Sequence, residues 1–186
     1  MSEKEKIIRY PIVYQFVMIA LTAFDIYLFY SSNVQTKLYC AAMFFILLNG
    51  WASSIDNEFE YGSLYLLVDA LCSVMYFLAL LYIKDGAFQI VWLLSSIIVA
   101  LYIIWNVLLQ LFNKYDENKR KELISYNWSN FILLMFSLFT FLILIFVENK
   151  QVQSISQIIG GIIWLMLLLK WYYDNYFNDL KKMNKK

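Results

Sequence analysis

The sequence predicts an all-α, polytopic integral membrane protein with six transmembrane helices in one bundle. Of its 186 residues, 62% are hydrophobic and 16% are charged, whereas a soluble domain has about 45–50% apolar and about 25% charged residues. The apolar residues fall into six blocks, each close to the ~20 residues that cross a hydrocarbon core as a helix. These blocks are solidly apolar and lack the period-two alternation of a membrane β-barrel.

The six predicted spans are joined by short polar connections, so we expect a single transmembrane domain over residues 1–186. Their expected ranges are 12–30, 38–54, 62–83, 87–112, 128–147 and 155–171. Pro11 opens the first span, where the missing N–H of a proline costs nothing. That span is long, lacks a small-residue cleavage site and contains Asp25, so we interpret it as an uncleaved anchor.

Aromatic residues near the ends of the predicted spans are typical of side chains at the headgroup level. The residues interpreted in this way are Tyr10, Tyr30, Tyr39, Trp51, Tyr61, Tyr82, Trp92, Tyr126, Trp128 and Trp171. Between the fourth and fifth spans, residues 113–127 mix acids with bases and are expected to form a short helix on the membrane surface.

The last two predicted spans differ from the first four. Span five is almost purely apolar, with only Ser137 and Thr140 as polar residues, and we expect it to be the helix most exposed to lipid. Span six contains Gly160 and Gly161, and small residues of this kind allow neighbouring helices to approach closely. We therefore expect spans five and six to brace the bundle.

The distribution of basic residues predicts that both termini lie in the cytoplasm. Six spans place twelve Lys and Arg residues on the side of the termini and three, Lys37, Lys84 and Lys150, on the other side. An excess of Lys and Arg marks the cytoplasmic side of a membrane protein. We therefore expect a multi-pass plasma-membrane protein, N-in and C-in, whose surroundings are membrane lipids.

Polar residues at membrane depth form a stripe on each of the first four spans. Asp25 and Asp69 are the two acids well inside spans, where a charged side chain costs upwards of about 2.5–3.5 kcal/mol on insertion scales. Each should face the bundle interior or water, or be protonated; the alternative is an interhelical hydrogen bond. The rise of a helix places them ~12 Å apart along the membrane normal. The other residues assigned to this polar pathway are Thr22, Asn49, Tyr102 and Asn106.

The predicted loop between spans two and three, within "SSIDNEFEYGS", holds three acids and no base. Asp56, Glu58 and Glu60 break the basic trend of the cytoplasmic side. One interpretation is a solvated turn, a second is an inner acidic mouth that concentrates cations, and a third is a docking site for a basic cytosolic protein.

The residues that most enzymes need are missing from the sequence. There is no histidine, which is the commonest general base and metal ligand, and no glycine-rich phosphate loop. Cys40 and Cys72 both fall within spans and are interpreted as packing residues. We therefore expect no enzymatic activity, cofactor, metal site or nucleic-acid partner.

Three functional hypotheses remain open at this point. The first is a small channel or transporter that passes cations or protons, as a homo-oligomer, along the polar stripes. The second is a non-catalytic membrane subunit, acting as anchor, sensor or effector with a soluble cytoplasmic partner in a defence, toxin–immunity or export system. The third is a membrane enzyme that acts on lipid.

Overall fold

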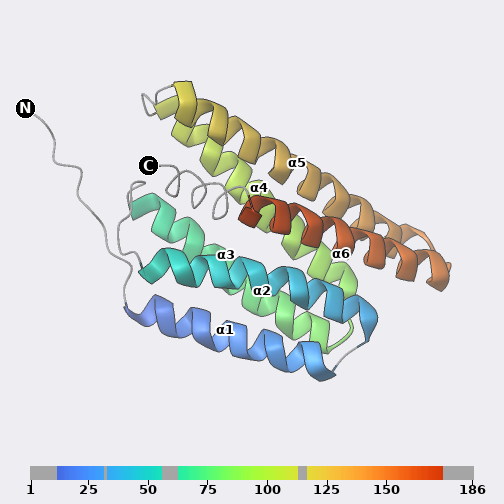
Figure 1. Ribbon diagram of the computed structural model, residues 1–186. Coiled ribbons are helices and arrows are strands. Elements are labelled where there is room, and N and C mark those ends of the chain that lie inside the picture. Colours follow the sequence, from blue (N-terminus) through green and yellow to red (C-terminus); the bar gives the residue numbers. More distant parts are fainter. Residues whose placement is uncertain (1–11, 32, 56–62, 113–116, 174–186) are drawn as a thin grey trace, which may run out of the picture.

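Six α-helices and their connections make up the computed structural model, which describes residues 12–31, 33–55, 63–112 and 117–173 (Figure 1). The helices are α1 (Ile12–Ser31), α2 (Val34–Ile55), α3 (Ser63–Lys84), α4 (Phe88–Phe112), α5 (Glu117–Phe146) and α6 (Lys150–Tyr172). These ranges contain no strand. The all-α prediction is therefore confirmed for this part of the chain.

Five of the six helices are long and apolar enough to cross a membrane. Their apolar stretches are Ile12–Ser31, Leu67–Lys84, Phe88–Leu108, Leu123–Phe146 and Lys150–Lys170. In α2 the apolar stretch among the described residues, Val34–Leu48, is shorter. This length and composition indicate a membrane-embedded protein.

Helix α5 begins at Glu117, eleven residues before the expected start at 128. The expectation of a separate surface helix is therefore wrong from residue 117 onward, since these residues continue directly into the apolar part of α5. No Gly or Pro interrupts the segment, and Lys121 forms an ion pair with Glu117 at 2.8 Å across one turn. At 30 residues and 1.5 Å each, α5 is about 45 Å long, which exceeds a hydrocarbon core of about 30 Å.

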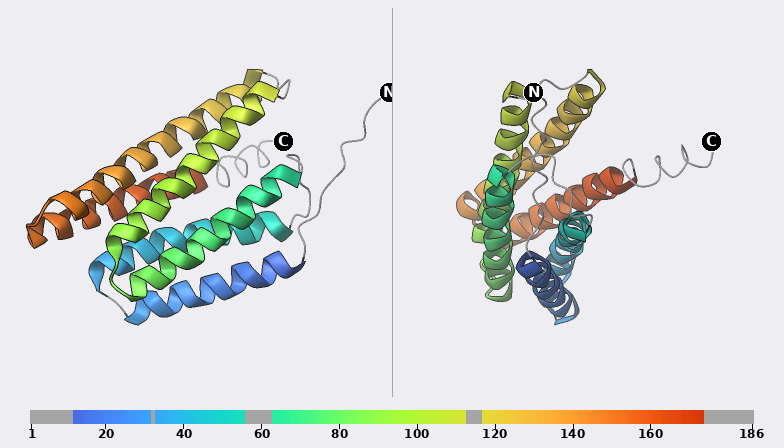
Figure 2. Two further views of the ribbon diagram at one scale, coloured as in Figure 1. Left: turned by 180° about the vertical axis from the view of Figure 1, so that it is seen from behind. Right: turned by 90° about the vertical axis from the view of Figure 1, so that its left-hand side faces the viewer.

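The helices pack in a closed ring rather than in simple chain order. Going around the ring, α1 packs against α2, α2 against α6, α6 against α5, and α5 against α4. Helix α4 then packs against α3, and α3 packs against α1 and closes the ring. Figures 1 and 2 accordingly show α1 and α5 on opposite sides of the bundle. A single chain thus encloses its own core.

Short connections join α1 to α2, α3 to α4 and α5 to α6 at one end of the bundle, on the right of Figure 1. The side-chain oxygen of Asn33 accepts the backbone N–H of Thr36 at 3.0 Å, and that of Asn149 accepts the N–H of Gln151 at 2.9 Å. Both side chains satisfy amides that have no partner inside their helix. Gly86, between α3 and α4, has φ +73°, a left-handed conformation that favours glycine. We call this end the short-connection end.

Two aromatic residues expected at the headgroup level lie in the core instead. Tyr39 and Trp92 are buried and meet edge to face with ring centroids 5.8 Å apart. The interpretation as headgroup residues is wrong for this pair, because α2 begins at Val34, before the expected start, so Tyr39 lies more than a turn inside it. Tyr30 and Trp128, in contrast, are exposed.

Close packing of α6 against its neighbours depends on its glycine pair, as expected. A Cβ at Gly160 would lie 2.8 Å from the indole of Trp92, and one at Gly161 would lie 3.1 Å from Cβ of Leu38. On the α5 side, the indole N–H of Trp164 donates to Ser137 Oγ at 2.9 Å. Helix α5 as a whole is the least covered of the five apolar stretches, with 17% of its apolar window buried, in agreement with the expected exposure to lipid.

Candidate functional site: two buried aspartate clusters

Helix α1 turns one narrow face toward the bundle interior. Its buried residues are Met18, Leu21, Asp25 and Leu28, spaced by three and four positions as one side of a helix requires. Asp25 is 1% exposed. The carboxyl group therefore points inward, as its cost at membrane depth requires.

The first group of polar side chains surrounds Asp25, and we call it the Asp25 cluster. The Cys40 thiol on α2 lies within hydrogen-bonding reach of the carboxyl, and the phenol of Tyr39 is within electrostatic range of it. The Tyr39 hydroxyl is 2.6 Å from Ser95 Oγ on α4. Ser95 already donates its proton to the carbonyl of Val91 at 2.9 Å, so Tyr39 is the donor in this pair.

One oxygen of the Asp25 carboxyl is not satisfied. Oδ1 is buried and has no hydrogen-bond partner. A buried polar atom without a partner costs about 1–3 kcal/mol, and most such atoms in native proteins are paired. Asp25 is therefore poorly explained as a purely structural hydrogen-bonding residue.

The second group surrounds Asp69, which is 7% exposed, and we call it the Asp69 cluster. Tyr102 on α4 donates its hydroxyl to Asp69 Oδ1 at 3.0 Å. Tyr14 on α1 lies within hydrogen-bonding reach of both Asp69 and Ser73. Ser73 itself donates to the backbone carbonyl of Asp69 at 2.8 Å. Three helices thus converge on this carboxyl.

The two clusters lie toward opposite ends of the bundle. Asp25 is six residues before the last residue of α1, Ser31, which lies at the short-connection end. Asp69 is six residues after the first residue of α3, Ser63, at the opposite end. Each carboxyl is therefore about 9 Å from its own end of the bundle along the helix axis.

Tyr76 on α3 is a buried phenol within electrostatic range of residues of both clusters. It is 4% exposed and lies two turns beyond Asp69 on the same face of the helix. Its phenol is within electrostatic range of Tyr39 from one cluster and of Asp69 and Tyr14 from the other. Each of the first four helices therefore carries buried polar side chains.

The remaining residues of the predicted pathway contribute less or lie outside the described residues. Thr22 donates its hydroxyl to the carbonyl of Met18 at 2.7 Å, inside α1. Asn106 is half-buried on α4, one turn beyond Tyr102. Three acids of the expected inner mouth, Asp56, Glu58 and Glu60, lie outside the described residues, as does the side chain of Asn49.

Sequence reasoning missed the contribution of α2 to the Asp25 cluster. Cys40 is a buried core residue, as expected, but its thiol also lies within hydrogen-bonding reach of the Asp25 carboxyl. Tyr39 was expected at the headgroup level, yet its buried phenol is within electrostatic range of that carboxyl. Helical periodicity could have indicated this face of α2, because its buried residues are three or four positions apart along the sequence. They are Thr36, Tyr39, Cys40, Met43 and Leu47. This periodicity is easily overlooked because most of α2 is apolar on every side.

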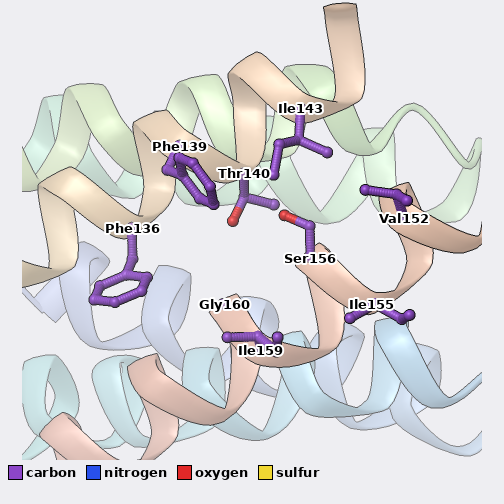
Figure 3. A pocket seen from close by; sticks show the side chains of 9 residues that line it. All are labelled: Phe136, Phe139, Thr140, Ile143, Val152, Ile155, Ser156, Ile159 and Gly160. Carbon is purple, nitrogen blue, oxygen red and sulfur yellow. The ribbon is translucent and has the colours of Figure 1, made fainter. Parts of the chain in front are cut away.

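A separate hollow of about 140 Å³ lies between α5 and α6 (Figure 3). Ser156 points across it toward Thr140, and the other lining side chains are apolar, among them Phe136, Phe139 and Ile159. None of its lining residues belongs to α1, α3 or α4. The hollow is therefore separate from both aspartate clusters.

Within the described ranges, no three His, Cys, Asp or Glu residues are close enough to hold a metal ion. The chemistry of the two clusters is that of carboxyl, phenol, hydroxyl and thiol groups. Comparison with known proteins identifies no relative: no family model, no curated protein and no solved structure matches this chain.

Proposed function

We propose that all six helices cross the plasma membrane and that both termini lie in the cytoplasm. Helix α2 packs between α1 and α6, so it is held at the same depth as two of the apolar helices. The three basic residues near the short-connection end, Lys37, Lys84 and Lys150, are exposed, and the other twelve Lys and Arg residues of the chain fall on the opposite side in this topology. The basic excess supports a cytoplasmic location for that opposite side.

Single cysteine substitutions test this topology. A membrane-impermeant maleimide should label Asp85→Cys on intact cells, whereas Lys121→Cys should become labelled only after the cells are opened. Both positions are exposed, and the native Cys40 and Cys72 are buried, which keeps the background low. Labelling of Lys121→Cys on intact cells would show that the proposed orientation is inverted.

We propose that the protein passes cations or protons through its first four helices, with Asp25 and Asp69 as the acidic groups of the path. The observation that carries this proposal is the Asp25 carboxyl, which is 1% exposed and holds an oxygen without a hydrogen-bond partner. An ionisable group at membrane depth is costly and by default indicates function. A purely packed core would be served better by leucine at this position.

The position of the two acids supports passage rather than a single binding site. Each carboxyl is about 9 Å from its own end of the bundle along the helix axis, so neither has to accept an ion from the far side. Both face the interior that one chain encloses. Two acids at different depths suit stepwise movement of a positive charge.

Flux through purified protein in lipid vesicles tests this function. Asp25→Asn and Asp69→Asn each remove the charge and keep the shape, and each is expected to lower the flux to near the leak of empty vesicles. Asp85→Asn, at an exposed position outside the helices, is the matched control and should leave the flux unchanged. Vesicles that take up neither protons nor Na⁺ or K⁺ would contradict the proposal.

The expected homo-oligomer remains a prediction. An acidic ring would need Asp56, Glu58 and Glu60, which lie outside the described residues. The two aspartate clusters are each built within one chain, so the proposed path needs no second copy. Oligomerisation would place several such paths side by side.

A second candidate function is a membrane subunit that binds a soluble cytoplasmic protein. Its support is the start of α5, where about ten residues extend beyond a hydrocarbon core of about 30 Å. Glu117, Arg120 and Lys121 are exposed there and offer charges of both signs. A protein of this kind would show no ion flux in the vesicle experiment.

A further inference from the structure

We propose that the hollow between α5 and α6 is a binding site for an uncharged lipid. The hydrocarbon of the lipid fills the hollow, and its hydroxyl or carbonyl oxygen forms a hydrogen bond with Ser156. The hollow is separate from both aspartate clusters, so the lipid binds there whether or not the first four helices pass ions.

The hollow has the size and the lining of a site for hydrocarbon. Its volume is about 140 Å³, and all of its lining side chains except Thr140 and Ser156 are apolar (Figure 3). An apolar cavity of about 150 Å³ in another protein stays dry and binds benzene. Because side chains around an empty hollow lose packing contacts, a hydrocarbon occupant is favoured.

The hollow opens on the outer surface of the helix pair. Phe139 on α5 and Ile155 and Ile159 on α6 line it and are 48–59% exposed. In a membrane this surface faces lipid, because α5 and α6 both carry apolar stretches long enough to cross it. A lipid chain therefore enters the hollow from the side, without passing through the bundle.

One hydroxyl in the wall of the hollow has no partner. Ser156 is 8% exposed, and its Oγ is buried without a hydrogen bond. Five other helical hydroxyls donate to the carbonyl four residues earlier, at 2.7–2.9 Å; they belong to Thr22, Ser73, Ser95, Ser96 and Ser137. Ser156 makes no such bond to Val152 and points across the hollow instead. Its hydroxyl is thus directed at the occupant.

The depth of Ser156 favours a lipid without a charged headgroup. Ser156 is six residues after Lys150, the first residue of α6, so it lies about 9 Å from the short-connection end. The 23 residues of α6 span about 34 Å. Since a hydrocarbon core is about 30 Å thick, Ser156 lies roughly 7 Å below the edge of the core. A charged group is costly at this depth, and no charged residue is among the described residues that line the hollow.

A small oxygen-containing group meets these conditions. A hydroxyl or an ester carbonyl on the lipid accepts a hydrogen bond from the Ser156 hydroxyl. Long-chain alcohols and diacylglycerol carry such an oxygen without a charged headgroup, whereas a phospholipid would have to draw its charged headgroup toward the hydrocarbon core.

Photolabelling of the full-length protein in phosphatidylcholine vesicles tests the site. Three probes carry the same diazirine on a hydrocarbon chain: octanol, octane and a phosphatidylcholine. The labelled residues are identified by mass spectrometry of peptides over a range of probe concentrations. Labelling by surrounding lipid rises in proportion to the probe, whereas labelling in a site saturates.

Octanol should label Phe139, Ile155 or Ile159 with saturation. Ser156→Ala should raise the half-saturating concentration of octanol about fivefold, as expected for the loss of one hydrogen bond, and should leave octane labelling unchanged. Ser156→Leu fills the hollow and should abolish saturation. Ile162→Phe is the matched control, because it adds bulk at an exposed position of α6 outside the hollow, and octanol labelling should stay as in the wild type.

Three results would each overturn the proposal. The first is octanol labelling that rises in proportion to concentration, or that saturates equally in the wild type and in Ser156→Ala. The second is a phosphatidylcholine probe that labels the hollow more than it labels Ile162. The third is disulfide-linked dimers of Ile159→Cys without saturable octanol labelling, which would show that a second copy covers the hollow. Ser156→Ala removes a single oxygen and keeps the test decisive if Ser156→Leu does not fold.

Discussion

Replacing Asp25 with leucine should make the protein more stable, by about 1–3 kcal/mol, while abolishing ion flux. The reason is that Asp25 is 1% exposed and its Oδ1 has no hydrogen-bond partner, and leaving such a group buried costs about this much. Leucine has the same branched outline and no polar atom. The stability of the reconstituted protein can be measured by denaturation with SDS in mixed micelles.

Asp69→Leu is the matched comparison, and its effect on stability should have the opposite sign. Asp69 accepts the Tyr102 hydroxyl at 3.0 Å, so leucine would remove a made hydrogen bond and cost about 1–3 kcal/mol. Opposite signs would indicate that Asp25 is kept for function at the expense of stability. They would also indicate that Asp69 stabilises the contact between α3 and α4 through its hydrogen bond with Tyr102. If Asp25→Leu destabilises the protein as much as Asp69→Leu, Asp25 is structural and the proposed path loses its main support.

Gly160→Val should destabilise the protein strongly, by about 3 kcal/mol, the upper part of the range for overpacked cores. A Cβ at this position would lie 2.8 Å from the Trp92 ring and 2.9 Å from Thr140 Oγ1, closer than real Cβ contacts. Gly161→Ala is the milder comparison, because its Cβ would lie 3.1 Å from Leu38. Thermal unfolding in detergent measures both effects.

A double substitution identifies the contact responsible. The closest atom to the added Cβ is Cη2, at the far end of the Trp92 indole, and Trp92→Phe removes that end of the ring. The loss in the Gly160→Val, Trp92→Phe double variant should therefore be smaller than the sum of the two single losses. If instead Gly160→Ala raises stability by the ~1 kcal/mol typical of Gly→Ala in an open helix, then α6 does not pack as closely as the structure indicates.

The sequence was informative where helical spacing alone decides which way a side chain faces. The inward direction of Asp25 and Asp69 followed from the cost of exposing a charge to lipid, and both are buried. Tyr102, which was assigned to the same polar pathway as the two acids, donates its hydroxyl to Asp69. The close approach at Gly160 was also predictable, because only a glycine leaves room for a neighbouring ring there.

Two other features were not predictable from apolar content and aromatic position alone. The apolar content of residues 117–127 is too low to mark them as part of a span, although good helix formers continue α5 through them. Tyr39 was misplaced because an aromatic residue near the end of an apolar run fits a headgroup position as well as a core position. Its burial depends on Trp92 and on the early start of α2.

The ring of helices has a consequence for how the protein is made in the cell. Helix α6 follows the other five in the chain, yet it is the partner of α2. Until α6 leaves the translocon, the face of α2 that carries Gln35 and Leu38 has no cover, although Gln35 later donates to Ser154. The gap between α2 and α5 therefore stays open during biogenesis, and a chain truncated before α6 would leave the Gln35 amide without its Ser154 partner and the Leu38 face of α2 uncovered.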